Sequence, residues 1–109
     1  MVTQQVAINM TNEFLKGLKD IGINLKKAYL FGSYARNKQH EHSDIDVALI
    51  ADEFVGVGPV DIKTFLKILR NYILIHPKTY STAEFEDGNP FLEEIKKTGI
   101  EISINPDFQ

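Results

Sequence analysis

The sequence contains no cysteine among its 109 residues. The chain can therefore form no disulfide, no thiolate nucleophile and no cysteine-ligated zinc site. It also has no apolar run close to the roughly 20 residues of a membrane-spanning helix, and residues 1–20 lack the pattern of a signal peptide. We expect a cytoplasmic protein with no membrane partner, whose chemistry uses oxygen and nitrogen groups.

An excess of positive charge is missing as well. The formal net charge is −3, whereas a module that grips duplex nucleic acid needs a basic stripe to displace counterions. We therefore expect no strong nucleic-acid binding by the chain itself. Its length predicts one domain over residues 1–109 with a small core, so a homo-oligomer would add stability and is one expected state.

Hydrophobic periodicity predicts an α/β (α+β) fold in which a mixed β-sheet packs with α-helices in a single small domain. The two strands that flank a polar loop at residues 33–43 should pair, because consecutive strands are usually neighbours. Near the C-terminal end, Phe91, Leu92 and Ile95 are expected to face inward. The expected helices cover residues 6–21, 61–69, 81–86 and 90–97, and the expected strands cover residues 28–31, 45–50, 72–76 and 100–104.

Two carboxylates mark the start of the second strand. Asp44 and Asp46 lie two residues apart, so strand alternation places them on one face while Ile45 takes the other. Such a pair favours a hard divalent cation between or beside the oxygens, and Mg²⁺ or Mn²⁺ is the expected ion. Alone, the pair is better explained by a turn followed by an exposed strand residue.

A second motif follows the first expected strand. Gly32 and Ser33 open a short helical turn, where unpaired backbone N–H groups can hold phosphate oxygens. Arg36 lies one turn further and could reach the same phosphates with its planar fork of donors. The alternative is a glycine turn with a serine cap and a surface pair between Arg36 and Glu41.

Together the motifs resemble those of the minimal nucleotidyltransferases of the DNA polymerase β-like superfamily. Gly32-Ser33-Tyr34-Ala35-Arg36, a variable polar loop and Ser43-Asp44-Ile45-Asp46 match every fixed position of that pattern. The resemblance implies that Gly32, Ser33 and Arg36 bind a nucleoside triphosphate, ATP in the first instance. It also implies that Asp44 and Asp46 are the catalytic metal ligands. The implied reaction transfers AMP to a hydroxyl acceptor, in some relatives as the antitoxin of a helical HEPN-type partner.

One departure from the pattern puts activity in doubt. Active members carry a third carboxylate on a later central strand, and the expected strand at residues 72–76 contains no acid. His76 stands at the end of that strand and could be a base, a metal ligand or an ordinary strand-end residue. The alternative function is therefore a catalytically weakened domain that binds nucleotide or a partner. The remaining acids, Asp61 among them, are explained by helix starts and loops, Asp61 by the helix dipole.

Overall fold

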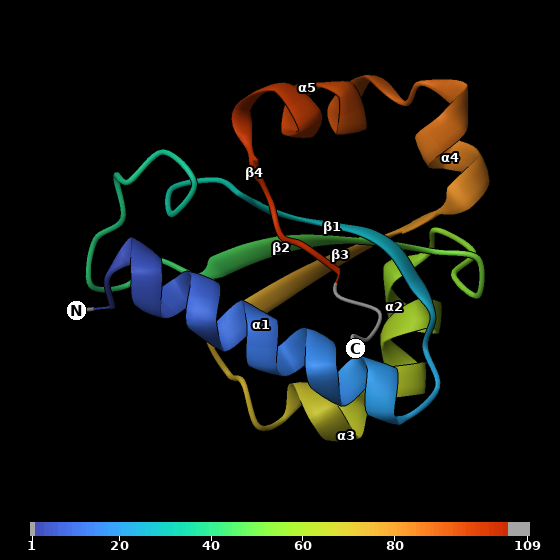
Figure 1. Ribbon diagram of the computed structural model, residues 1–109, viewed down its shortest axis with the longest axis horizontal. Coiled ribbons are helices and arrows are strands. Elements are labelled where there is room, and N and C mark those ends of the chain that lie inside the picture. Colours follow the sequence, from blue (N-terminus) through green and yellow to red (C-terminus); the bar gives the residue numbers. More distant parts are fainter. Residues whose placement is uncertain (1, 105–109) are drawn as a thin grey trace.

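The computed structural model describes residues 2–104 and is organised around a four-stranded mixed sheet (Figure 1). The strand order is β3-β2-β1-β4. β1 pairs antiparallel with β2 and with β4, while β2 and β3 run parallel. The mixed sheet and the pairing of the strands around the polar loop are confirmed. The strands are β1 (Leu25–Phe31), β2 (Ile45–Ala51), β3 (Ile75–Ser81) and β4 (Ile100–Glu101).

Helices cover both faces of this sheet (Figure 1). The long helix α1 (Gln4–Asp20) lies across one face together with the short helices that connect β2 to β3, and α4 and α5 lie on the other face. None of the described helices is long and apolar enough to cross a membrane. The shorter helices are α2 (Gly58–Ile62), the 3₁₀ turn η1 (Lys63–Phe65), α3 (Leu66–Leu69), α4 (Thr82–Asp87) and α5 (Pro90–Thr98).

Local sequence signals explain where α1 begins and ends. The Thr3 side chain accepts a hydrogen bond from the Val6 N–H at 3.1 Å, which satisfies one of the free donors of the first turn. Phe14 and Leu18 are fully buried against the sheet. Gly22 follows the helix with φ +92°, a conformation that glycine adopts without strain, and so allows the chain to leave the helix there.

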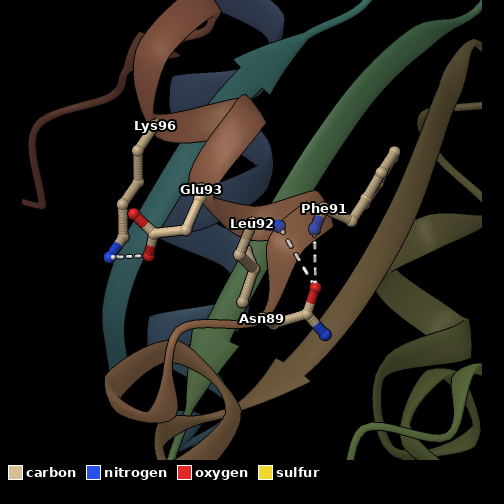
Figure 2. A network of polar contacts seen from close by, with 5 residues as sticks. All are labelled: Asn89, Phe91, Leu92, Glu93 and Lys96. Atoms are coloured by element: carbon tan, nitrogen blue, oxygen red, sulfur yellow. Dashed lines mark hydrogen bonds and ion pairs between the residues drawn. The ribbon is translucent and has the colours of Figure 1, made fainter.

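Side-chain caps also define the two C-terminal helices. Ser81 and Glu84 form a reciprocal capping box at the start of α4. The Asn89 side chain accepts hydrogen bonds from the backbone N–H groups of Phe91 and Leu92 at the start of α5 (Figure 2). Leu92 is buried as expected, but Phe91 is 46% exposed, so its predicted inward orientation is wrong.

β3 differs most from the prediction. The expected strand at residues 72–76 lies only partly within the observed one, because the segment before Ile75 forms turns, and Ile73 is highly exposed. β3 instead continues through Pro77 to Ser81. An edge strand has a free side, where the missing N–H of proline breaks no ladder bond, and β3 occupies such an edge. His76 is accordingly near the beginning of the strand and not at its end.

The last expected strand is also shorter than predicted. Its ladder covers Ile100–Glu101 alone, although burial still alternates, with Ile102 buried and its neighbours exposed. The Ile102 N–H donates to the Ala28 carbonyl at 2.8 Å, which keeps the segment beside β1.

Candidate functional site

The turn after β1 carries the first part of the candidate site. Gly32 has φ +76°, and the Arg36 N–H donates to its carbonyl at 3.3 Å. The expected short helical turn is thus a run of turns with one helix-type bond and no assigned helix. Within residues 2–104, the backbone N–H groups of Ser33 and Tyr34 have no hydrogen-bond acceptor. Such free donors can hold an anion.

Contacts with the hydrophobic core and with α1 hold this turn in place. The Tyr34 side chain is buried in the cluster that α1 covers, and its carbonyl accepts a hydrogen bond from the Gln4 side chain at 2.8 Å. A side chain anchored in this way restricts the loop on both sides of it. The turn is therefore a preorganised feature of the fold.

Asp46 lies directly against the turn. It pairs with Phe31, the residue before Gly32, in the β1–β2 ladder. A Cβ placed on Gly32 would overlap the Asp46 Oδ2 atom and would lie 3.2 Å from its Cγ. Glycine is therefore needed at position 32 for its positive φ and for this close approach. The expected meeting of the two motifs is confirmed by the contact between Gly32 and Asp46.

Asp44 occupies a more open position. It precedes β2, is exposed, and is separated from Asp46 by Ile45, which is fully buried on the α1 face. Ser43 has a local role, because its hydroxyl accepts a hydrogen bond from the His40 N–H at 2.9 Å. That bond closes the polar loop immediately before the two aspartates.

His76 lies beside Asp46. In the parallel ladder it is the register partner of Asp46, and its Nδ1 lies 3.4 Å from the Asp46 Oδ1. The histidine side chain is 72% exposed and the aspartate 28%. β3 has no acidic residue over Ile75–Ser81, which confirms the gap that the sequence indicated.

The donor set suits a metal ion that is shared with a substrate. Among residues 2–104, no three histidine, aspartate or glutamate side chains converge to form a complete metal cage. Mg²⁺ is commonly held by one or two carboxylates together with substrate phosphates, so a full protein cage is not required. Asp46 offers a partly exposed carboxylate beside free backbone donors, and Asp44 is two residues away. The residues therefore fit a divalent ion bound with a triphosphate.

A cleft of about 500 Å³ begins at Asp46 and His76. Phe31 and Phe91 pack edge to face along one side with centroids 6.0 Å apart, and the Lys78 ammonium lies 5.3 Å from the Phe91 ring centroid. Figure 2 shows Phe91 projecting away from α5, whereas Leu92 turns inward. An exposed aromatic and a cation thus line a space beside the carboxylate.

A buried carboxylate fixes the opposite rim of the cleft. Asp61 accepts hydrogen bonds from the Val55 and Gly56 N–H groups, both at 2.9 Å, and from the Thr79 hydroxyl at 2.8 Å. Asp61 stands in the first turn of α2, which confirms its predicted place at a helix start, and its side chain is almost fully buried and turned toward the preceding loop. In the sequence, only Gly56 and Gly58, which precede Asp61, indicated a tight loop here.

Arg36 is exposed at the end of the turn. Over the described part of the chain it forms no ion pair, and Glu41 instead lies 3.8 Å from His42. The alternative pairing of Arg36 with Glu41 is thus wrong. A phosphate-binding role for Arg36, like the roles of the other site residues, stays a prediction.

Comparison with known proteins agrees with this geometry. A family model described as polymerase β, nucleotidyltransferase matches residues 11–107. Over 101 residues the chain is 31% identical to a Methanocaldococcus jannaschii protein named as a candidate protein adenylyltransferase, covering 87% of this chain and 97% of that one. Over 40 residues it is 48% identical to protein adenylyltransferase MntA of Shewanella oneidensis, covering 37% of this chain and only 29% of MntA.

A solved structure agrees in fold. The crystal structure of a toxin–antitoxin with AMP-PNP superimposes with a TM-score of 0.61 at 23% identity, over 84% of this chain and 71% of that one. The family model spans most of the chain, and the relative that matches along nearly its whole length is similar enough to indicate common descent. The chain belongs to the polymerase β nucleotidyltransferase family.

Proposed function

We propose that this protein transfers AMP from ATP to a hydroxyl group of a partner protein and that the partner is a helical, HEPN-type toxin. The observation that carries the proposal is the contact of Gly32 with Asp46, which joins a phosphate-binding turn to a metal-binding carboxylate. The names of the relatives support the finer points. MntA is named a protein adenylyltransferase, and the similar fold was solved as a toxin–antitoxin with AMP-PNP. We place the reaction in the cytoplasm.

Each residue of the site has a role in this proposal. The free backbone N–H groups at Ser33 and Tyr34 bind the triphosphate, and Arg36 closes over its outer oxygens. Asp44 and Asp46 hold the divalent ion, Mg²⁺ or Mn²⁺. When bound, the ion would neutralise charge on the attacking and leaving oxygens.

The chemistry is a substitution at the α-phosphorus of ATP. The acceptor oxygen forms a bond to that phosphorus while the bond to the bridging oxygen breaks, and pyrophosphate and a proton are released. The open cleft beside Asp46 gives an acceptor side chain access, with Phe91 and Lys78 at its wall. A protein acceptor also agrees with the net charge of −3, which disfavours a long nucleic acid.

Radiolabelled ATP tests the proposal directly. The chain is incubated with Mg²⁺ or Mn²⁺ and a HEPN-type protein from the same source as the candidate partner, and label on that protein is measured. We expect labelling by the wild type and a loss of about a thousandfold in kcat/KM for Asp46→Ala. Asp87→Ala, at an exposed acid on α4 outside the cleft, is the matched control and should label normally. Equal labelling by wild type and Asp46→Ala would refute the proposal.

The absence of an acid from β3 favours a second candidate function. Without that carboxylate the domain could bind nucleotide and partner with no transfer. Calorimetry then measures ATP binding while the same sample is assayed for pyrophosphate. Binding without any pyrophosphate in the presence of the partner supports this second function.

A further inference from the structure

We propose that His76 is a nitrogen ligand of the divalent ion held by Asp46, so that the site combines carboxylate and imidazole and binds Mn²⁺ in preference to Mg²⁺. The inference rests on the proposed function, because it concerns the ion that the nucleotidyltransferase site would hold. It goes beyond that function by assigning the group that occupies the third position and the metal that this group selects.

The sheet itself places the two groups together. Parallel pairing makes His76 the register partner of Asp46, with 3.4 Å between Nδ1 and Oδ1. Two ligands that bind one ion at about 2.0–2.2 Å lie about 3 to 3.6 Å from each other. The observed separation is thus one that a single ion can bridge. Pro77 follows the histidine and restricts its backbone to extended conformations, which favours a fixed position for the imidazole.

The surroundings direct both groups toward the cleft. The other carboxylate oxygen of Asp46, Oδ2, is the one beside Gly32, so Oδ1 is the oxygen that faces the imidazole. The His76 imidazole has no other hydrogen-bond partner within residues 2–104 and is mostly exposed. Both residues line the cleft through which the acceptor would approach, and Asp46 also touches the Gly32 turn that would hold the triphosphate. An ion between them would be within reach of substrate phosphates.

A plain ion pair is a weaker explanation of the same geometry. Charge-assisted N–H···O bonds are normally about 2.7–2.9 Å long, and this pair is 3.4 Å apart. An exposed pair of this kind contributes little to stability. The two groups converge on one point without bonding tightly to each other, which is the arrangement of a ligand pair.

The ligand types determine which metal is favoured. Mg²⁺ takes oxygen ligands almost exclusively; Mn²⁺ shares its preference for carboxylates, but as a first-row transition ion it accepts an imidazole nitrogen more readily than Mg²⁺ does. Replacing a carboxylate by a neutral imidazole therefore removes one negative oxygen ligand and weakens Mg²⁺ binding more than Mn²⁺ binding.

Pulsed electron paramagnetic resonance of bound Mn²⁺ tests the assignment. The full chain is loaded with Mn²⁺ and inorganic tripolyphosphate, which contains no nitrogen, so any ¹⁴N modulation comes from the protein. We expect imidazole modulation in the wild type and none in His76→Ala. His42→Ala is the matched control, because His42 is an exposed histidine of the polar loop, and its modulation should be unchanged. Circular dichroism checks the folding of each variant.

Calorimetry gives an independent readout. The ratio of the Mg²⁺ to the Mn²⁺ dissociation constant should fall about tenfold in His76→Asp, which restores an oxygen ligand. Mn²⁺ bound through Asp46 with no ¹⁴N modulation in the wild type overturns the inference and leaves the proposed function standing. A wild-type chain that binds no Mn²⁺ with tripolyphosphate overturns both.

Discussion

The two faces of the sheet differ although the same strands build them. On the face covered by α1, β2 contributes Ile45, Val47 and Leu49, all fully buried in one cluster. On the opposite face the alternate residues of β2 begin with the partly exposed Asp46, and only Ala48 and Ile50 are buried beneath α5. Because side chains alternate along a strand, β2 presents core residues on one face and the candidate site residue Asp46 on the other.

The helices account for this difference. α1 extends along one face of the sheet, whereas α4 and α5 lie away from the ends at which β2 and β3 begin (Figure 1). Asp46 and His76 are the second residues of these two strands, and both line the open cleft. An active site needs exposed polar groups on a rigid support, and the α1 face supplies that support. Disturbing the α1 face should therefore reduce stability, and disturbing the cleft should reduce activity.

The largest expected effect on stability comes from the α1 face. Phe14 is fully buried and packs edge to face on Phe65 and Tyr72. Phe14→Ala should lower the free energy of unfolding by about 3–5 kcal/mol, because it leaves a cavity in a packed core. Urea denaturation measures the loss. Activity per folded molecule should remain close to wild type, and a specific activity reduced more than tenfold would contradict the separation of the two faces.

Gly32→Ala should reduce the rate of AMP transfer more than it reduces stability. An added Cβ meets the Asp46 carboxylate and must also tolerate a positive φ, so we expect about a hundredfold loss of transfer and about 1–3 kcal/mol of stability. Gly22→Ala is the matched control, since it has a similar positive φ with nothing within 4 Å. If both variants lose activity equally, strain alone and not the contact with Asp46 explains the effect.

Asp61→Asn tests the rim of the cleft. One of the oxygens that accept from Val55, Gly56 and Thr79 becomes a donor that faces donors, so the free energy of unfolding should fall by about 2 kcal/mol. Thermal denaturation measures this loss, with the exposed Asp87→Asn as control. The KM of the acceptor should rise while that of ATP changes little. An unchanged melting temperature would show that this hydrogen-bond cluster is unimportant.

Tyr80→Phe should have the smallest effect at neutral pH. The Tyr80 hydroxyl is buried with no hydrogen-bond partner among residues 2–104, so its removal should stabilise the fold by about 1 kcal/mol. Burial, with a contribution from Glu84, raises the pKa of Tyr80 to about 12. The folded protein then keeps a proton that the unfolded chain releases above about pH 10, and stability falls between pH 10 and pH 12. Denaturation at several pH values should show a weaker fall in Tyr80→Phe.

Much of this arrangement follows from the sequence by itself. A short motif was enough to predict the candidate phosphate- and metal-binding residues Gly32, Ser33, Asp44 and Asp46. The prediction depends only on residue type and on spacing along one or two elements. The caps at Ser81 and Asn89 depend on local sequence in the same way, because a helix start is defined by its own first turn.

Only the tertiary structure decided what lies across the sheet from those residues. The position of His76 opposite Asp46 depends on the register of β3, and the apolar residues before Ile75 wrongly suggested an earlier strand. The Asp61 side chain is buried because the loop just before α2 and Thr79 of the more distant β3 both supply it with donors, and Phe91 is turned outward toward Lys78. Local periodicity determines which residues can form an element, whereas pairing and packing between distant segments determine which side chains meet.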